Sequence, residues 1–165
     1  MKNNKKHTIF ENLLILEIGD FIVAPYCTKL FADYGAQVIK LEPPEGDSSR
    51  KSGPFPDNIP HQETSGLYLN LNTNKKSMTL NLQNPDGINL FIKLITKASL
   101  LVIDKPPYFL ESIGLSFEKL QGLNPNLIIT SITPFGDHGP YAEYETNDFI
   151  SFALTNRMSP HGIID

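Results

Sequence analysis

Cysteine is nearly missing from this 165-residue sequence, and so are long apolar runs. The single cysteine, Cys27, cannot form an internal disulfide, which favours a reducing compartment and hence a cytoplasmic protein. No stretch approaches the ~18 apolar residues of a membrane-spanning helix, and the basic residues 1–7 are followed by polar residues, unlike a secretory signal. With a formal net charge of -4, the composition offers no electrostatic case for nucleic acid or an anionic membrane as a partner.

The glycine-rich fingerprints of nucleotide-binding folds are missing as well. Only Gly19 follows the first apolar run, and without a G-x-G-x-x-G pattern the backbone cannot closely approach a pyrophosphate. Glu42 nevertheless lies roughly 20 residues further on, where dinucleotide folds place a ribose-binding acid. No Walker pattern is present, and the four histidines and one cysteine lack metal-ligand spacing. We therefore expect no metal site, and NAD, ATP or GTP chemistry has little support.

What the sequence does contain is a regular alternation of apolar runs with helical patterns. The runs predict strands at residues 13–18, 36–41, 77–82, 100–103 and 127–132. Helices are predicted from Pro25 to Gly35, from Asn84 through the apolar face that ends at Ile95, and over 109–113, 117–123 and 148–158. This order predicts an α/β domain with a mainly parallel sheet flanked by helices, over residues 13–165. Residues 1–12 are expected to form a flexible polar tail, and residues 45–65 a long surface loop.

The turn at residues 17–25 is the first candidate ligand site. It joins the end of the first parallel strand to a helix, which is where open α/β sheets bind anionic ligands. Four acids close by, namely Asp20, Asp33, Glu42 and Asp47, could form a catalytic carboxylate pair. The simpler interpretation, which we favour, is that they are solvated acids of strand ends and loops.

Cys27 and the pair Lys75-Lys76 also allow two interpretations. A cysteine near a helix N-terminus can have a lowered thiol pKa, but such a residue is more often a small part of the core. The two lysines could attract phosphates, although exposed lysines usually form a solvated face. From these patterns alone, the sequence indicates an α/β domain with a plausible anion site, and no particular reaction.

Eight short segments, in order and at similar spacing, carry a resemblance to a known family. They are residues 32–36 (ADYGA), 38–44 (VIKLEPP), 46–47 (GD) with Arg50, 74–77 (NKKS) with Leu80 and Leu82, 84–87 (NPDG), 110–115 (LESIGL), 123–128 (LNPNLI) and 135–141 (FGDHGPY). Together they make the sequence similar to the family III CoA-transferases, which include formyl-CoA and carnitine-CoA transferases and α-methylacyl-CoA racemases. The resemblance covers nearly everything from Leu13 to Gly162.

The resemblance implies a Rossmann-like domain that cradles CoA, joined to a second domain in a longer chain that forms an interlocked homodimer. It also implies nucleophilic catalysis, in which an aspartate carboxylate attacks an acyl-CoA thioester and forms an anhydride. That aspartate follows a Gly-Pro-Pro loop beyond the glycine that Gly162 resembles, and Asp165 falls within the loop. We therefore assign no catalytic residue, and expect a fragment, one half of a split gene or an inactive remnant.

Six CoA-binding positions follow from the resemblance. Ile22, Val23 and Ala24 stand where the family's backbone and small side chains meet the nucleotide. Leu80 and the residues through Gln83 match the strand end beside the adenine and ribose. Lys105 stands where a basic or aromatic residue often contacts CoA.

Several departures from the family pattern bear on affinity. Ile103-Asp104 replaces a usual Glu-Asn pair, and Ser112 replaces an arginine whose planar fork would bind phosphate. Asn81 replaces an aspartate, and Glu145 stands where a basic residue can occur. Asn147 replaces the histidine of the racemase branch and cannot shuttle a proton near neutral pH, which disfavours racemase activity.

The leading hypothesis is the N-terminal CoA-binding portion of a transferase that moves CoA between an acyl-CoA and a carboxylic acid. Its partners would be these two substrates and either a second copy or a missing second half. The alternative is a non-catalytic binding or interaction module that keeps the fold and has lost the CoA phosphate contacts.

Overall fold

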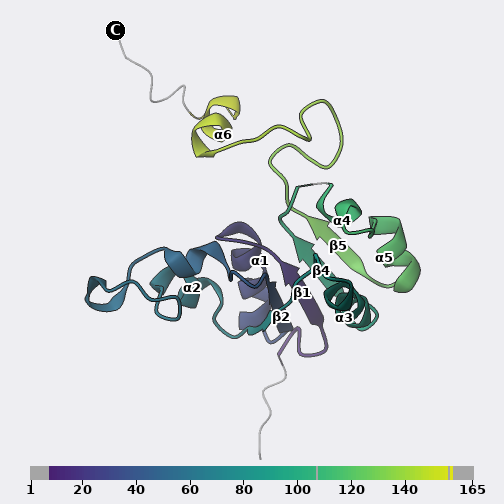
Figure 1. Ribbon diagram of the computed structural model, residues 1–165, viewed down its shortest axis with the longest axis horizontal. Coiled ribbons are helices and arrows are strands. Elements are labelled where there is room, and N and C mark those ends of the chain that lie inside the picture. Colours follow the sequence, from purple (N-terminus) through teal and green to yellow (C-terminus); the bar gives the residue numbers. More distant parts are fainter. Residues whose placement is uncertain (1–7, 107, 156, 158–165) are drawn as a thin grey trace, which may run out of the picture.

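The sheet is five-stranded and entirely parallel in the computed structural model, which describes residues 8–106, 108–155 and 157 (Figure 1). Its strands are β1 (Leu14–Ile18), β2 (Gln37–Glu42), β3 (Lys76–Thr79), β4 (Leu100–Ile103) and β5 (Ile128–Ser131). Its helices are α1 (Val23–Asp33), α2 (Gly66–Leu71), α3 (Pro85–Ile95), α4 (Phe109–Ser112), α5 (Phe117–Leu123) and α6 (Asp148–Leu154), with short 3-10 turns η1 (Ser48–Lys51) and η2 (Pro56–Asn58). The fold class predicted from the sequence is confirmed.

The strands lie in the order β3-β2-β1-β4-β5, so the chain changes direction across the sheet between β1 and β4. The register aligns Leu16 of β1 with Ile39 of β2 and with Leu101 of β4. In open parallel sheets, the crevice at such a reversal, beyond the carboxyl ends of the strands, is the usual place for a ligand. The fold therefore directs attention to the residues that follow β1 and β4.

Successive side chains of each strand point to opposite faces, and each face has its own apolar core. Ile15 of β1 packs with Ala24 of α1 on one face. Leu16 packs with Phe91 of α3 and Leu120 of α5 on the other. On the α1 side, Phe10 also packs, with its ring centroid 5.3 Å from that of Phe31, so contacts with α1 begin within the predicted tail. Both faces of the central strands are thus buried, as a parallel sheet requires.

Local signals explain several element boundaries. The Asn84 side chain accepts a hydrogen bond from the Asp86 amide at 2.9 Å, and Pro85 occupies the first turn, so α3 begins where the sequence predicted. After α1, Gly35 adopts a φ of +98°, a conformation that other residues rarely take. The chain can therefore turn sharply into β2.

Three predicted elements differ from those observed. The strand expected over 77–82 ends at Thr79. Leu80 and Leu82 instead pack into the core on the face of the sheet covered by α3. The loop expected over 45–65 contains η1 and η2 and is anchored by buried side chains of Asp47, Ser49 and Ser65. Helix α2 was not predicted, and the helix expected over 148–158 ends at Leu154, with residue 158 outside the described part of the chain.

Helix α6 lies at the end of the long loop that follows β5, away from the sheet (Figure 1). None of its residues is buried, although Phe149, Phe152 and Leu154 are large and apolar. Within the part of the chain that the structure describes, no helix is long and apolar enough to cross a membrane.

Candidate functional site

A groove of about 420 Å³ opens beyond the carboxyl ends of β1, β2 and β4. Gly19 enters its wall directly after β1, Pro43 directly after β2, and Lys105 two residues after β4. Leu80 and Gln83 line it from the segment that follows β3. The groove therefore brings together Leu80, Gln83 and Lys105, three of the positions predicted from the sequence, at the edge of the sheet where a ligand is expected.

The other three predicted positions lie outside this groove. Ala24 is fully buried, so its side chain cannot meet a ligand, and Ile22 and Val23 are exposed beside the start of α1. Gly19 lines the groove and also packs against the start of α1, where a Cβ on this residue would lie only 2.5 Å from the Ala24 Cβ. The tight turn between β1 and α1 thus depends on glycine at this position, and a role for residues 22–24 in binding CoA stays a prediction.

The amino end of α1, which the sequence predicted as an anion site, already holds a carboxylate. Asp104 Oδ1 accepts a hydrogen bond from the Asp20 amide at 3.0 Å, and Oδ2 accepts one from the Ala24 amide at 3.2 Å. Burial raises the pKa of this carboxyl, against the opposing effects of the two amides and of Lys105. A phosphate therefore meets no free amides there from these two residues, and it meets a negative charge.

The groove itself is mainly apolar. Seven of its twelve lining residues are aliphatic, proline or phenylalanine, which suits a ligand that buries a hydrophobic body and makes few polar contacts. Of the described residues that line it, Lys105 is the only cation and Glu45 the only acid, while Asn81 and Gln83 add uncharged polar groups.

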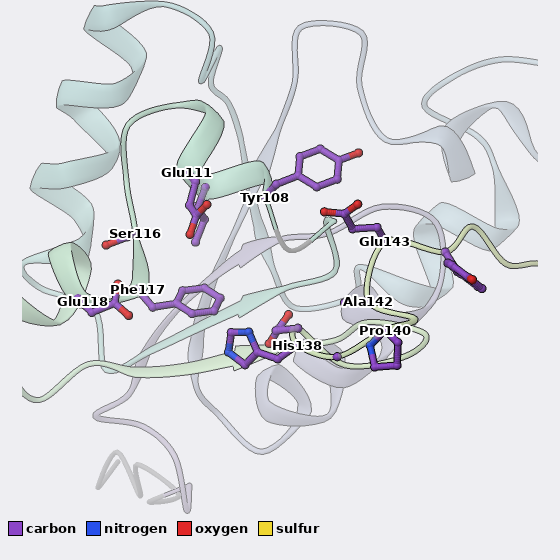
Figure 2. Close-up of a pocket in the computed structure, with 13 residues that line it drawn as sticks. Tyr108, Glu111, Ser116, Phe117, Glu118, His138, Pro140, Ala142 and Glu143 are labelled. Atoms are coloured by element: carbon purple, nitrogen blue, oxygen red, sulfur yellow. The ribbon is translucent and has the colours of Figure 1, made fainter.

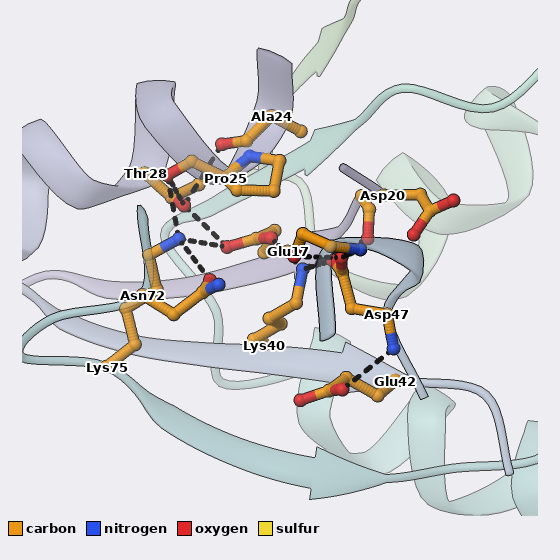
Figure 3. A network of polar contacts seen from close by, with 12 residues as sticks. Glu17, Asp20, Ala24, Pro25, Thr28, Lys40, Glu42, Asp47, Asn72 and Lys75 are labelled. Atoms are coloured by element: carbon orange, nitrogen blue, oxygen red, sulfur yellow. Dashed lines mark hydrogen bonds and ion pairs between the residues drawn. The ribbon is translucent and has the colours of Figure 1, made fainter. Parts of the chain in front are cut away.

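A buried network of charges lies on the α1 face of the sheet (Figure 3). Glu17 is fully buried, and its carboxylate contacts Lys40 Nζ at 2.6 Å and Lys75 Nζ at 2.8 Å. Lys40 Nζ also pairs with Asp47 Oδ2 at 2.6 Å, and the Thr28 hydroxyl donates to Glu17 at 2.5 Å. The expectation that Asp47 and Lys75 would simply be solvated is therefore wrong, because both side chains are held in this network.

Glu42 extends the network and was also expected to be solvated. Its carboxylate pairs with Arg50, whose Nε lies 2.7 Å away, and accepts hydrogen bonds from Tyr68 and Ser77. Burial acts to raise the pKa of Glu42, but these hydrogen bonds, led by the one from Arg50, lower it to about 2. Glu42 Oε2 accepts from the Asp47 amide at 3.0 Å as well, which fixes both ends of the turn that forms the Pro43 wall of the groove.

The remaining candidate residues, Cys27, Asp33 and Asp20, pack or form hydrogen bonds and ion pairs within the fold. Burial, and then the Glu17 carboxylate, raise the pKa of the Cys27 thiol, so the idea of an activated cysteine is wrong and the core interpretation holds. Asp33 pairs with Lys29 on the surface, and the Asp20 carboxylate accepts from the Ser48 amide at 2.8 Å. No two of the four acids form a carboxylate pair in the contacts described.

Three of the positions that depart from the family pattern form hydrogen bonds with nearby residues. Ser112 donates to the Phe109 carbonyl at 2.7 Å, and Asn81 accepts from the Gln83 amide at 2.9 Å. Asn147 caps α6 by accepting from the Ile150 amide at 3.0 Å.

A second cavity of about 550 Å³ lies between the α4–α5 region and the loop after β5 (Figure 2). Its lining includes the carboxylates of Glu111, Glu118, Asp137 and Glu143, and no lysine or arginine among the residues described. Although this cavity is the larger one, its charge would repel a polyphosphate ligand. No residue predicted from the sequence as a CoA contact lines it.

Comparisons with known proteins place this geometry in a family. The sequence profile of CoA-transferase family III matches residues 10–163. The chain is 39% identical, over 86% of its length, to the succinyl-CoA:(R)-benzylsuccinate CoA-transferase subunit BbsE of Thauera aromatica, and 35% identical, over 87%, to the succinyl-CoA–D-citramalate CoA-transferase of Chloroflexus aurantiacus. These matches span 34% and 35% of the two relatives, so the chain spans about a third of their length. The crystal structure of a CAIB/BAIF family protein from Brucella suis superposes with a TM-score of 0.83 at 31% identity, covering 93% of this chain and 40% of that one.

Proposed function

The chain belongs to CoA-transferase family III, and from this membership we propose that it supplies the CoA-binding groove of an enzyme that moves CoA between an acyl-CoA and a carboxylic acid. The observation that carries the proposal is the meeting of Leu80, Gln83 and Lys105 in one groove beside the β1–β4 reversal. This is the edge of an open parallel sheet at which nucleotide-containing ligands bind.

The chemistry of the groove supports the same assignment. Its apolar walls can cover the adenine and the pantetheine arm of CoA, while Asn81 and Gln83 offer amide groups to polar atoms. Lys105 is the described lining residue that can pair with a phosphate. The network of Glu42 and Asp47 stiffens the turn that forms one wall, so the groove is formed before the ligand arrives.

The reaction proposed for the whole enzyme is acyl transfer through a carboxylate. An aspartate would attack the thioester carbonyl, forming a mixed anhydride and releasing CoA thiolate. The acceptor carboxylate would then displace the donor acid from the aspartyl carbonyl, and the CoA thiolate would attack the acceptor's carbonyl in the new anhydride, which gives the acceptor's CoA thioester and frees the aspartate. We assign no catalytic residue to this chain, whose part would be to bind and position CoA. We further propose that residues 13–165 act as one domain, completed by a second half of the enzyme or by a second copy.

A second candidate function rests on the charge at the start of α1. Because Asp104 occupies the Ala24 amide of α1 and Ser112 is bonded to its own helix, one phosphate contact that the strand-turn-helix pattern predicts and one that the family resemblance implies are missing. A non-catalytic module that keeps the fold and contacts another protein would tolerate both changes. The two functions differ in whether CoA binds at all.

Calorimetric titration of the 165-residue chain with CoA tests the proposal. We expect weak binding, in the high micromolar range, that Lys105→Ala reduces by about tenfold or more, since a charge-assisted hydrogen bond is worth about 1.5–3 kcal/mol. The matched control is Lys97→Ala, an exposed lysine at the opposite end of β4, which should bind CoA like the parent. No CoA binding by the folded protein would favour the module instead.

A further inference from the structure

The proposed CoA groove carries almost no favourable charge for a phosphorylated ligand. Lys105 and Glu45 are the charged side chains among its described lining residues, and they offset each other. A third charge lies just behind the wall, because an Asp104 carboxylate oxygen is 3.4 Å from the place that a Cβ would take on Gly19. The groove and its wall thus contain one cation and two acids.

Two backbone amides near the groove are not free to make up for this shortage. Free amides at the first turn of a helix commonly bind phosphate in α/β folds. Here the Ala24 amide in the first turn of α1 already donates to Asp104 at 3.2 Å, and so does the Asp20 amide in the loop before α1, at 3.0 Å. A phosphate that approached α1 would have to compete with a carboxylate that the chain itself holds in place.

CoA brings two kinds of phosphate, which this groove would treat differently. Each phosphate of the pyrophosphate bridge carries one negative charge, whereas the 3′-phosphate on the ribose is a monoester that carries about −1.5 to −2 near pH 7. A nearly doubly charged group is repelled by Glu45 and Asp104 more strongly than a singly charged phosphate is. The single ammonium of Lys105 is itself next to Asp104 in sequence and acts on its carboxylate.

We infer that this groove, if it binds CoA as proposed above, does not recognise the 3′-phosphate and binds dephospho-CoA as well as CoA. The groove holds the apolar portions and the pyrophosphate, and the 3′-phosphate stays in solvent. Glu45 and Asp104 are then specificity-determining residues, because their charges remove the preference for the additional phosphate. A built phosphate clamp would instead favour CoA by tenfold or more.

The test is a pair of calorimetric titrations of the 165-residue chain, with CoA and with dephospho-CoA, at low salt. We expect dissociation constants within about threefold of each other. Glu45→Gln should then strengthen CoA binding by about twofold to fivefold, and dephospho-CoA binding by less, since an exposed charge has only a modest effect. Asp33→Asn, at the far end of α1, removes a carboxylate outside the groove and should change neither value.

The outcomes separate the inference from the function on which it rests. If CoA binds at least tenfold more tightly than dephospho-CoA, the inference is overturned and the proposed function stands. If neither ligand binds to the folded chain, the proposed function fails and the inference with it. Asp104→Asn should act like Glu45→Gln, but it also alters the α1 cap, so the exposed Glu45 provides the deciding variant.

Discussion

The carboxylate of Asp104 accepts a hydrogen bond from the backbone amide of Ala24, at 3.2 Å and across 80 residues of sequence. This contact joins the end of β4 to the start of α1, on the two sides of the point where the sheet reverses its order. A negative side chain at a helix N-terminus stabilises the helix. The chain therefore uses as a structural joint the position at which related folds place a ligand phosphate.

The first prediction concerns the pH dependence of this joint. Because burial raises the pKa of Asp104 above 3.8, the folded state holds the proton more tightly than the unfolded state. The stability of the parent relative to Asp104→Asn should therefore fall as the pH rises above about 4. Urea unfolding of both proteins between pH 3.5 and pH 7 measures this difference.

Asp33→Asn provides a control of opposite sign. The hydrogen bond from Lys29 lowers the pKa of Asp33, so the parent should gain stability over this variant as the pH rises. Parallel curves for the parent and Asp104→Asn would contradict the first prediction.

The second prediction concerns Glu42, whose carboxyl has its pKa lowered from 4.5 to about 2. A lowered pKa in the folded state contributes stability above the unfolded value of 4.5, and this stability is lost as the pH falls toward 2. The contribution at pH 7 is on the order of 3 kcal/mol, and roughly 2 kcal/mol of it should disappear by pH 3. Glu42→Gln should lose this pH dependence.

The measurement is urea unfolding at pH 7 and pH 3. Glu45→Gln is the matched control, since Glu45 is exposed three positions further on, and its free energy of unfolding should change by less than about 0.5 kcal/mol. If Glu42→Gln differed equally from the parent at both pH values, the network would not hold Glu42 ionised in the way described.

The third prediction compares two neighbouring lysines. The Lys75 side chain is 2% exposed, and its ammonium contacts Glu17, the Pro25 carbonyl and Asn72. Lys75→Met should destabilise the fold by about 3–5 kcal/mol, because it leaves a buried carboxylate with one cation fewer. Lys76→Met, at the exposed next position, should change stability by less than about 0.5 kcal/mol. Equal effects of the two substitutions, measured by urea unfolding, would argue against the buried network.

The sequence predicted the strands well, because short apolar runs between turn signals leave few alternatives. The strand expected over 100–103 and the helix over 117–123 are observed at those residues. Helix α2 was not predicted because its six residues, at the end of a loop rich in proline and glycine, are too few to show a period of 3.6.

The charged network could not be predicted in the same way. Glu17 and Lys40 lie in central strands of a parallel sheet, where both faces are buried. A charged side chain there needs a partner of opposite charge. From that rule, an oppositely charged partner could have been expected for each of these two residues. The rule could not have identified Lys75, which is 58 residues from Glu17 in sequence, because only the folded sheet brings the two together.

The last prediction concerns the apolar side chains of α6. Phe149 is 70% exposed and Leu154 66% exposed, and neighbouring Phe152 is 45% exposed, so three large apolar groups of one short helix face solvent. Clustered apolar surface of this kind favours association, because burying it removes apolar area from water. We expect the 165-residue chain to self-associate at high concentration, and the double variant Phe149→Ser, Phe152→Ser to associate less. Sedimentation velocity over a concentration series measures the change.

Ile9→Ser is the control, because Ile9 is 79% exposed at a site far from α6 in sequence, and this variant should associate like the parent. A parent chain that stays monomeric at high concentration would mean that α6 needs no cover, which would favour the stand-alone module over the half of a larger enzyme.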